Sequence, residues 1–336
     1  VLKLNIYEET FYQLVGTLFH AILEKCLTVE TNYDELWNQE LTNLNHEFNN
    51  KEKFFLSKLK DELLFIIETI KDQENFTNLH DELHEERIYT SLSGNMNITF
   101  TGIIDKIKYK DMGDHTIVAI IDYKTGNPNL DLTTVPYGIG MQLPVYLYLA
   151  KNSKKLTNIK VAGFYLQKVL NNEVTVDKSH SYEQLKKKNL LLQGYSNEDQ
   201  SILSEFDNSY MDSNIIKSMK TKKDYSFYSY CKVLSNKEMD LITNIAENKI
   251  NEGAEKISNA EFPISPKKIG KTNYGCALCQ FKDICFHTAD DIEELEPLNI
   301  DDILERPKKR RRRRRIMAWT PEQQTAMEET GKNIIV

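Results

Sequence analysis

The sequence predicts a mixed α/β or α+β domain, and three observations support this class. The first 75 residues carry apolar side chains at helical spacing. Between residues 96 and 123 the pattern changes to the alternation that is typical of strands. A further helix, further strands and a mostly helical, charged stretch follow, without an internal repeat.

The amino-terminal part is expected to form three helices, at residues 10–27, 34–49 and 53–75. A polar turn at Asn49 and Asn50 separates the second helix from the third. The first helix carries one apolar face, formed by Phe11, Leu14, Val15, Leu18 and Ile22. Residues 81–87 are polar, and they predict only a short helix or a loop.

Two strands are expected next, at residues 96–110 and 116–123, joined by a turn. Helical spacing returns at residues 138–151. Residues 159–169 and 174–176 predict a second hairpin, closed by Asn171 and Asn172. The remainder of this region, residues 182–258, is expected to be mostly helical.

Composition limits the class of protein. Of 336 residues, 40% are hydrophobic and 28% charged, which suits one large or two smaller globular domains and excludes collagen, low-complexity chains and disulfide-dense mini-proteins. No apolar run approaches the roughly 18 residues of a membrane helix.

Charge is unevenly distributed along the chain. The net charge is -7, although residues 308–315 are eight consecutive Lys or Arg residues, so the rest of the chain is strongly acidic. This balance argues against a nonspecific nucleic-acid coat, and any DNA site is expected in a local groove.

The ends of the chain suggest a segment of a longer protein, since it begins at Val1 and has no signal peptide. One domain is expected at residues 1–290, followed by an acidic and then polybasic linker at 291–316 and a different segment at 317–336. The basic run fits a localisation signal, a nucleic-acid patch or a solvated linker, and the last is favoured.

Two carboxylates and a lysine are the sharpest chemical feature. Asp105 follows Gly102-Ile103-Ile104, and Asp122 precedes Tyr123 and Lys124. The two aspartates lie on neighbouring predicted strands, and Asp122 and Lys124 share one strand face. Two carboxylates beside an ammonium group predict a Mg²⁺ or Mn²⁺ site with a cation close to a reacting phosphate.

The alternative for this feature is an ordinary salt bridge on a surface hairpin, because Asp-x-Lys is a common pattern. The apolar pair before Asp122 and the tight exit at Gly126 favour a site instead. Gln142 and Tyr146 add a polar pair at i and i+4 on the next helix. His20, on the first helix, is not assignable by itself.

Five cysteines are present, and three of them form the pattern Cys276-x2-Cys279-x5-Cys285. Without a secretory signal, this pattern indicates a metal or cluster site in a reducing compartment. Zinc, with His287 as a possible fourth ligand, and an iron-sulfur cluster are both open on spacing alone. Cys26 and Cys231 are expected to be ordinary buried or free thiols.

Taken together, four motifs resemble the RecB-type branch of the PD-(D/E)XK nuclease superfamily: Gly16-x3-His20, Gly102-x2-Asp105-Lys106, Asp122-Tyr123-Lys124-Thr125-Gly126 and Gln142-x3-Tyr146. The resemblance implies a restriction-endonuclease-like core, with a mixed sheet flanked by helices and a helical insertion at residues 30–80.

The same resemblance implies roles for the motif residues. His20, Asp105 and Asp122 would ligate the metal together with the carbonyl group of Tyr123. Lys124 would orient the attacking water or stabilise the transition state. Gln142 and Tyr146 would hold the substrate or order the site.

The cysteine pattern resembles that of AddB-type helicase-nuclease subunits. There, three such cysteines close the nuclease domain and a fourth precedes its first helix, so that a [4Fe-4S] cluster joins the two ends. The resemblance implies that Cys276, Cys279 and Cys285, within residues 270–290, are three of the ligands. No cysteine precedes Cys26, so the fourth is expected upstream of Val1.

The last 20 residues resemble the start of a UvrD-like helicase such as the AddA partner subunit. The resemblance rests on Trp319-Thr320-Pro321-Glu322-Gln323-Gln324 and on the apolar end at Ile334 to Val336. In that family Gln324 would contact adenine. The chain ends before a phosphate-binding loop, so no ATPase is expected of it.

These resemblances imply a metal-dependent DNA exonuclease that acts in double-strand-break repair in the bacterial cytoplasm. Its substrates would be double-stranded ends and single strands, digested on the strand that ends 5′ at the break. Its partner would be an AddA-type helicase subunit in a heterodimer, with no membrane. A stand-alone RecB-like nuclease and a non-catalytic DNA-binding scaffold are the alternatives.

Overall fold

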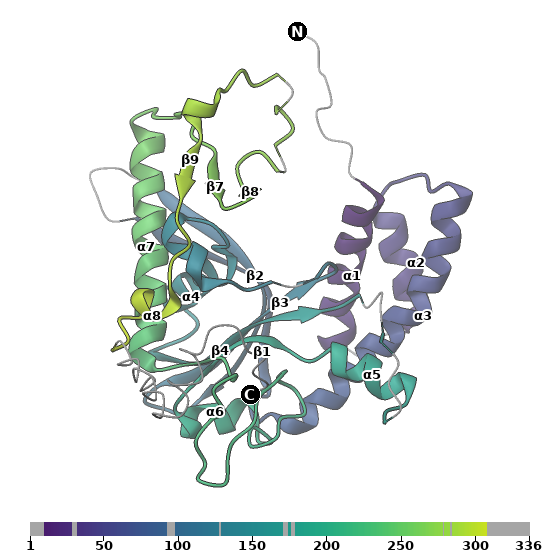
Figure 1. Ribbon diagram of the computed structural model, residues 1–336. Helices are drawn as coiled ribbons and strands as arrows, with labels where there is room; N and C mark the ends of the chain where they lie inside the picture. Colours follow the sequence, from purple (N-terminus) through teal and green to yellow (C-terminus); the bar gives the residue numbers. More distant parts are fainter. Residues whose placement is uncertain are drawn as a thin grey trace, which may run out of the picture.

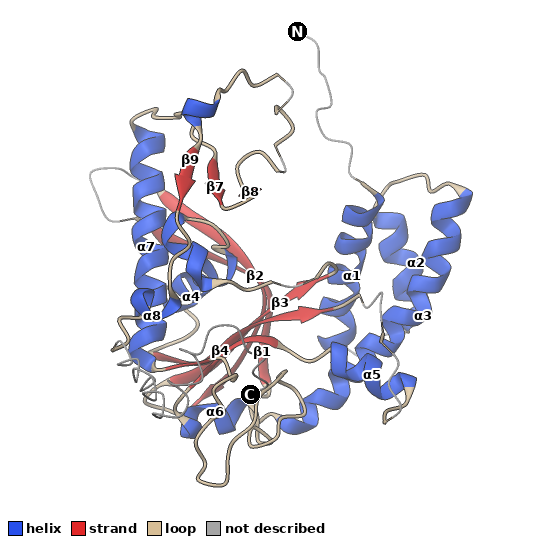
Figure 2. Cartoon of the chain, viewed as in Figure 1, coloured by secondary structure: helices blue, strands red, loops and turns tan. Residues whose placement is uncertain are grey.

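The computed structural model describes residues 10–307 except 29–31, 93–97, 128, 171–173, 176–178, 278 and 283. The basic run and the helicase-like segment therefore lie outside the described residues. Within them, a mixed β-sheet forms the centre of the molecule and helices pack on both of its faces (Figure 2). The predicted α/β class is confirmed.

The central sheet has six strands in the order of the chain. They are β1 Asp81–Ser91, β2 Thr99–Asp111, β3 Thr116–Lys124, β4 Ile159–Lys168, β5 Gln193–Asn197 and β6 Val233–Leu234. The pairs β3–β4 and β5–β6 are parallel, and the other neighbours are antiparallel. A parallel pair needs a crossover, which here contains helix α4 Gln142–Lys151.

Two apolar cores lie on opposite faces of this sheet. One packs under α1 Phe11–Thr28, α2 Tyr33–Asn43, α3 Asn50–Gln73 and α6 Gln200–Phe206. The other packs under α4 and α7 Asn236–Ser258. Figure 1 shows α1 to α3 on one side of the sheet and α4 and α7 on the other.

Strand β3 is buried on both faces, because its side chains alternate between the two cores. Ile117, Ala119, Ile121 and Tyr123 belong to the core under α1 and α3. Val118 and Ile120 belong to the core under α4. Continuing this alternation places Asp122 and Lys124 on the α4 face.

The remaining elements are short. They are η1 Glu74–Phe76, η2 Leu132–Tyr137, α5 Tyr182–Asn189, η3 Ala289–Asp291, α8 Ile300–Ile303 and a small sheet of β7 Lys267–Ile269, β8 Thr272–Asn273 and β9 Glu293–Leu295. No helix in the described part of the chain is long and apolar enough to cross a membrane.

Residues 81–87 correct the sequence analysis, because they begin strand β1 instead of forming a short helix or loop. The segment is polar because β1 is an edge strand with many partly exposed positions. Glu82 also pairs with two lysines of β2, so its charge is part of the strand pairing.

The second predicted hairpin is also wrong in its pairing. The antiparallel partner of β4 is β5, about 25 residues further along, while Val174 and Thr175 belong to no strand. Asn171 and Asn172, the expected turn, lie outside the described residues. Helix α5 lies between β4 and its true partner in the sequence, so local turn signals do not indicate this pairing.

Two further stretches differ from expectation. Residues 207–232 form a loop without a helix, although 182–258 was expected to be mostly helical. The first half of the expected linker carries β9, which pairs with β7, and α8. The predicted second helix ends at Asn43, and Asn45 adopts a left-handed conformation beyond it (φ 48°).

Candidate metal centre and nuclease site

The predicted site lies where β2 and β3 separate. Their last paired residues are Lys106 and Ile121, so Asp105 and Asp122 face one another directly beyond that pair. The backbone N–H of Tyr123 donates to Asp105 Oδ2 at 3.1 Å, in place of a strand-strand bond. The hairpin therefore brings the two carboxylates together, as the sequence predicts.

Asp105 is 9% exposed and sits among donors and charges. The Tyr146 hydroxyl donates to its Oδ1 at 3.4 Å. Burial raises the pKa of Asp105 to about 6, and the nearby negative charge of Asp122 adds to this. The two carboxylates repel each other, and paired carboxylates are a common ligand set for a divalent cation.

Asp122 is completely buried at the end of β3. Its Oδ1 accepts a hydrogen bond of 2.5 Å from Gln142 Nε2, and its Oδ2 lies 2.6 Å from Lys124 Nζ. Burial raises the pKa of Asp122, and Lys124 opposes that rise. Lys124 pairs with Oδ2, and because a carboxylate oxygen has more than one lone pair, this oxygen keeps capacity for a further ligand.

His20 reaches the strands from α1. Its Nε2 lies 3.1 Å from the carbonyl oxygen of Tyr123, and because a carbonyl only accepts, Nε2 is the donor. Its Nδ1 lies 3.4 Å from Asp105 Oδ2. Burial by itself lowers the pKa of His20, but the hydrogen bond to Glu85 and the charges of the carboxylates raise it overall. Nδ1 thus faces the carboxylates, where a bound proton or metal ion neutralises them.

Glu85 is the residue that the sequence analysis missed. The β1–β2 register pairs His84 with Lys106 and Glu86 with Ile104, so Glu85 is opposite Asp105. Ligand atoms of His20, Glu85 and Asp105 lie within 4.8 Å of one another. The backbone of Glu85 is left-handed (φ 45°), a strained conformation that is concentrated at functional sites.

Glu85 was missed for a physical reason. Reading residues 81–87 as a helix or loop gave no register against Asp105. Glu85 could have been found by predicting strand β1, because the pairing of β1 with β2 places one of its acidic residues opposite Asp105.

Gln142 and Tyr146 lie one turn apart on α4, and both point to the site. The Gln142 Nε2 group donates to Asp122 and, at 3.0 Å, to the Tyr146 hydroxyl. The Gln142 Oε1 atom accepts from Lys124 Nζ at 2.6 Å. These contacts join α4 to both strands and fix the position of the lysine.

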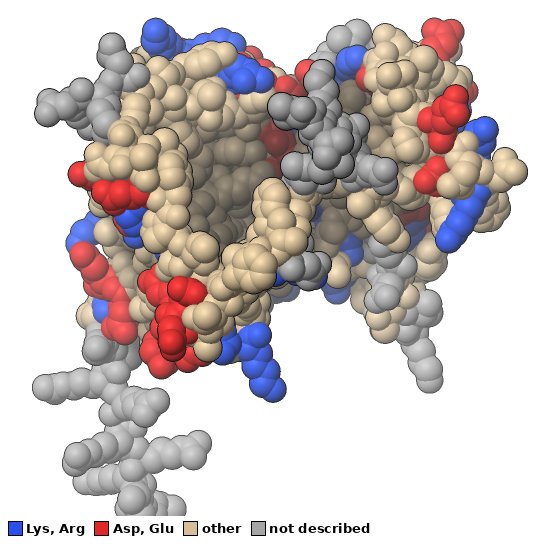
Figure 3. Space-filling view, turned by 90° about the horizontal axis from the view of Figure 1, so that it is seen from above, with Lys and Arg blue, Asp and Glu red and all other residues tan. Residues whose placement is uncertain are grey.

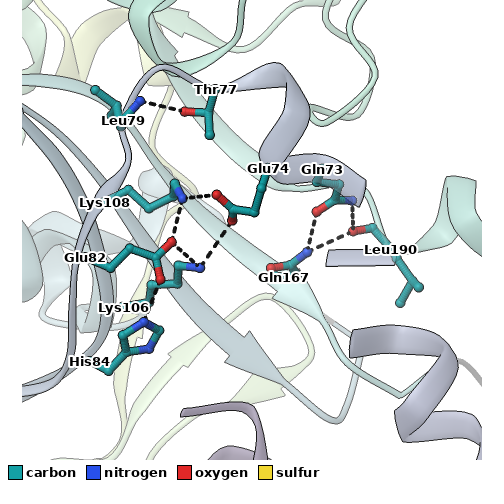
Figure 4. A network of polar contacts seen from close by, with 10 residues as sticks. All are labelled: Gln73, Glu74, Thr77, Leu79, Glu82, His84, Lys106, Lys108, Gln167 and Leu190. Carbon is teal, nitrogen blue, oxygen red and sulfur yellow. Dashed lines mark hydrogen bonds and ion pairs between the residues drawn. The ribbon is translucent and has the colours of Figure 1, made fainter. Parts of the chain in front are cut away.

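A network of charged side chains starts at Lys106, the residue after Asp105 (Figure 4). Lys106 and Lys108 of β2 are 1% and 2% exposed, and both approach Glu82 of β1 and Glu74 of η1. His84 Nε2 lies 2.7 Å from the other oxygen of Glu82. The network ties β1 to β2 beside the position where Glu85 meets Asp105.

The surface above these strands is hollowed. Viewed from above, the molecule is notched between the part that carries α1 to α3 and the part that carries α7 and β7 to β9, and mostly uncharged residues line the hollow (Figure 3).

The cysteine segment lies on the α7 side of that notch (Figure 1). Cys276, Cys279 and Cys285 are half-buried thiols without disulfide partners among the described residues. Cys276 Sγ lies 3.8 Å from His287 Nε2. Cys26 is buried in the α1 core, and Cys231 Sγ contacts the carbonyl groups of Ser218 and Lys220, so both are apart from this segment.

Comparison with known proteins adds a family to this geometry. The family described as "PD-(D/E)XK nuclease superfamily" matches residues 2–286. Three similar relatives are each named as one subunit of an ATP-dependent helicase/deoxyribonuclease. The protein of Thermoanaerobacter sp. is 31% identical over 199 residues, which are 58% of this chain and 17% of that one.

The relative from Carboxydothermus hydrogenoformans is 30% identical over 251 residues (69% of this chain, 22% of that one). The relative from Bacillus subtilis is 26% identical over 252 residues (71% and 20%). The chain thus spans about a fifth of the length of these curated relatives.

Proposed function

Because the chain belongs to the PD-(D/E)XK nuclease superfamily, we propose that residues 1–290 are the nuclease domain of an AddB-type protein and hydrolyse DNA phosphodiester bonds. The printed names of the similar relatives support this proposal. The observation that carries it is the meeting of His20, Asp105 and Asp122 beside Lys124, from one helix and two strands.

The metal ligands in this proposal are His20, Asp105, Asp122 and the carbonyl group of Tyr123, with Glu85 added by the geometry. The residues fit a divalent cation because oxygen donors and one imidazole nitrogen converge there. Ligand atoms of His20, Glu85 and Asp105 lie within 4.8 Å of one another, and Asp122 faces Asp105 across the strand pair. Bound Mg²⁺ or Mn²⁺ would lower the pKa of a coordinated water and offset negative charge on the phosphate.

Lys124 is the group that contacts the substrate in this proposal. An ammonium group has three donors, and Asp122 and Gln142 occupy two of them. Its side chain is 33% exposed, so the third donor is available to a water or to a phosphate oxygen. A fixed cation at that point stabilises charge that develops in the transition state.

Gln142 and Tyr146 are positioning residues in this scheme. The amide group of Gln142 donates to Asp122 and accepts from Lys124, so it fixes these two side chains relative to each other. The Tyr146 hydroxyl donates to Asp105. Both act on the ligands and the lysine without needing a contact with DNA. This supports the ordering role over the substrate-holding one.

Cys276, Cys279 and Cys285 are proposed to supply three ligands of a [4Fe-4S] cluster. Three thiols within ten residues on one surface segment suit such a cluster. The contact between Cys276 and His287 supports zinc as the second candidate, because three thiolates and an imidazole form a structural zinc site. Iron and zinc analysis of the purified chain, with its absorbance near 400 nm, separates the two.

The names of the similar relatives also suggest a partner and a process for this domain. We propose that the domain works with an AddA-type helicase in a heterodimer on double-stranded DNA ends and single strands, in double-strand-break repair in the bacterial cytoplasm. Residues 291–316 would connect it to the helicase-like segment at 317–336. Co-purification of a helicase distinguishes this from a stand-alone nuclease.

The experiment is degradation of end-labelled linear DNA with Mg²⁺ by the full chain, by Asp122→Ala and by Lys124→Ala. We expect each substitution to slow cleavage by about 10²-fold or more. The matched controls are Asp240→Ala and Lys151→Ala, which remove an exposed Asp–Lys pair on the outer helices. These controls are expected to cleave at the parent rate.

Two outcomes would oppose the proposal. Equal cleavage rates for the parent and for Asp122→Ala would show that Asp122 is not part of the active site. A folded, metal-binding chain that binds DNA without cutting it would favour the non-catalytic scaffold.

A further inference from the structure

The loop between α6 and β6 carries a patch of tyrosines and lysines that the nuclease site does not use. We call residues 217–232 the Tyr–Lys loop. It contains five lysines and one acidic residue, in a chain whose net charge is -7. Its lysines are exposed: Lys217, Lys220, Lys222, Lys223 and Lys232.

Two tyrosines of this loop form a stacked pair at the surface. The rings of Tyr228 and Tyr230 are 5.2 Å apart and inclined by only 10°. They are 37% and 54% exposed, and Tyr225 nearby is 62% exposed. Lys222 Nζ lies 5.9 Å from the centre of the Tyr228 ring. Exposed parallel rings beside ammonium groups are unusual for a surface that contacts only water.

The Tyr–Lys loop is held in place by its own hydrogen bonds. Thr221 and Phe227 form an antiparallel bridge, and the N–H of Tyr228 donates to the carbonyl group of Lys220. Phe227 packs against the core under α1 and α3. Tyr225, at the tip, adopts a left-handed backbone (φ 63°), a conformation that costs free energy and turns its ring outward.

The loop also lies along the sheet that carries the metal centre. Ile216 bridges to Leu192 just before β5, and β6 after the loop pairs with β5. Strand β5 is two strands from β3, which is roughly 10 Å at the usual spacing.

We propose that the Tyr–Lys loop binds single-stranded DNA outside the metal centre. Bases stack on Tyr228 and Tyr230, and Lys222 and Lys223 contact phosphates. Base stacking on aromatic rings tolerates any sequence and needs unpaired bases, whereas a duplex presents only its backbone. The inference rests on the proposed function in one respect, that the bound strand is the one the nuclease site processes.

Charge favours DNA over a protein partner on this surface. Besides serines and Asp224, the exposed side chains of the loop are tyrosines and lysines, while Ile215, Ile216 and Met219 are buried. A docking face for a protein usually has an apolar centre with a polar rim. Here the rings are interleaved with lysines, which is the arrangement of single-strand binding surfaces.

The test is fluorescence anisotropy of a labelled 20-nucleotide thymidine oligomer with the full chain in EDTA, which prevents cleavage. Tyr228→Ala with Tyr230→Ala is expected to weaken binding by about 10-fold or more. Tyr228→Phe with Tyr230→Phe keeps the stacking faces and should retain the parent affinity, which excludes simple misfolding.

The lysines are tested by salt dependence. Lys222→Ala with Lys223→Ala should reduce the slope of log K against log salt by about 1.4, since each phosphate contact with a single strand contributes roughly 0.7. The matched control is Tyr89→Ala with Lys154→Ala, an exposed tyrosine and lysine beside edge strand β1. It should bind like the parent.

Two results would overturn the inference. One is unchanged oligomer affinity in the Tyr→Ala pair, which would leave protein docking as the use of this surface. The other is an equal loss for a blunt duplex, which would make the loop a general electrostatic contact.

Hydrolysis of bis(4-nitrophenyl) phosphate separates this inference from the proposed function. That substrate is too small to span the site and the loop, so the Tyr→Ala pair should hydrolyse it normally. A chain that binds the oligomer through the loop but hydrolyses neither substrate keeps this inference and contradicts the nuclease proposal.

Discussion

At the residue scale, the site is a small cluster of two buried carboxylates with an imidazole and an ammonium group beside them. Asp105 and Asp122 face each other with raised pKa values, and His20 and Lys124 offset only part of their charge. Burying two carboxylates this close together is costly, and in the proposed function a bound metal ion would offset that cost. Glu85 adds a third carboxylate at the same point.

The first prediction concerns Glu85. Glu85→Gln removes one negative charge and a possible oxygen ligand while keeping the size of the side chain. We expect Mn²⁺ to bind roughly 10-fold more weakly or worse, measured by isothermal titration calorimetry at neutral pH. The control is Glu86→Gln. Glu86, the next residue, pairs with Lys155 away from the site, so this variant should bind Mn²⁺ normally. Unchanged affinity in Glu85→Gln would remove Glu85 from the ligand set.

At the element scale, the site is stabilised by the way that β1, β2 and η1 are joined. Glu82 accepts from two buried lysines and contacts His84, and burial alone would raise its pKa. The hydrogen bond to His84 and the charges of Lys106 and Lys108 outweigh that effect and lower the pKa of Glu82 well below its usual range. Its ionised form therefore stabilises the fold.

The second prediction is a pH-dependent loss of stability in Glu82→Gln. At pH 7 the variant should be less stable by about 3 kcal/mol, because two buried lysines lose their shared carboxylate. The unfolded chain protonates Glu82 near pH 4.5, while the folded chain holds it ionised to a lower pH. The difference between parent and variant should thus be complete above pH 4.5 and shrink below it.

Urea unfolding from pH 3 to pH 7 measures this difference. Glu86→Gln is the control, because an ion pair with an exposed lysine contributes at most about 1 kcal/mol. If the free energies of unfolding of the parent and of Glu82→Gln differ by the same amount at every pH, the charge-based explanation is contradicted.

The third prediction concerns the pairing of β4 with β5. A Cβ atom on Gly194 would lie 2.1 Å from the carbonyl oxygen of Phe164 and 2.8 Å from the Cα of Tyr165. These are backbone atoms that have little freedom to move, so Gly194→Ala should cost about 2 kcal/mol or more.

Gly253→Ala is the matched control for that prediction. Gly253 lies in α7 with no atom within 4 Å of the added Cβ, so the alanine should stabilise the protein by about 0.5–1 kcal/mol. Thermal unfolding of the two variants checks both predictions, a loss of stability for Gly194→Ala and a gain for Gly253→Ala. A stable Gly194→Ala would mean that β4 and β5 separate more easily than this packing implies.

At the scale of the whole molecule, residues 291–307 contribute side chains to the core under α4 and α7. Leu304 is 4% exposed in the core under α4 and α7, and Ile300 and Ile303 pack beside it. Arg306 donates to the carbonyl group of Val233 and pairs with Glu238 on α7. These contacts attach the end of the described chain to the edge of the sheet.

The fourth prediction follows from this attachment. A chain that ends at Asp290 should unfold at a temperature about 4 °C or more below one that ends at Pro307, because it loses the burial of Leu304 and the pairing of β9. Differential scanning calorimetry measures the difference. Leu304→Ala in the longer chain should reproduce part of it. Equal melting temperatures would show that residues 291–307 add nothing to the fold.

The sequence by itself determined the features that are local in the chain. Helical spacing predicted the three amino-terminal helices, and alternation predicted the β2–β3 hairpin, because apolar periodicity follows directly from the geometry of each element. Asp105 and Asp122 could be brought together from sequence because one short hairpin joins them. Lys124 lies on the same strand, two residues beyond Asp122, whereas Gln142 was assigned from its i, i+4 spacing with Tyr146 and from the family resemblance.

Only the tertiary structure decided which distant segments meet. Glu85 became part of the site through the register of β1 on β2, and β4 pairs with β5 across about 25 intervening residues. The Tyr228–Tyr230 stack and the place of Leu304 in the core depend likewise on contacts between segments far apart in sequence. Such contacts are chosen by burial and pairing across the whole molecule, which local spacing does not record.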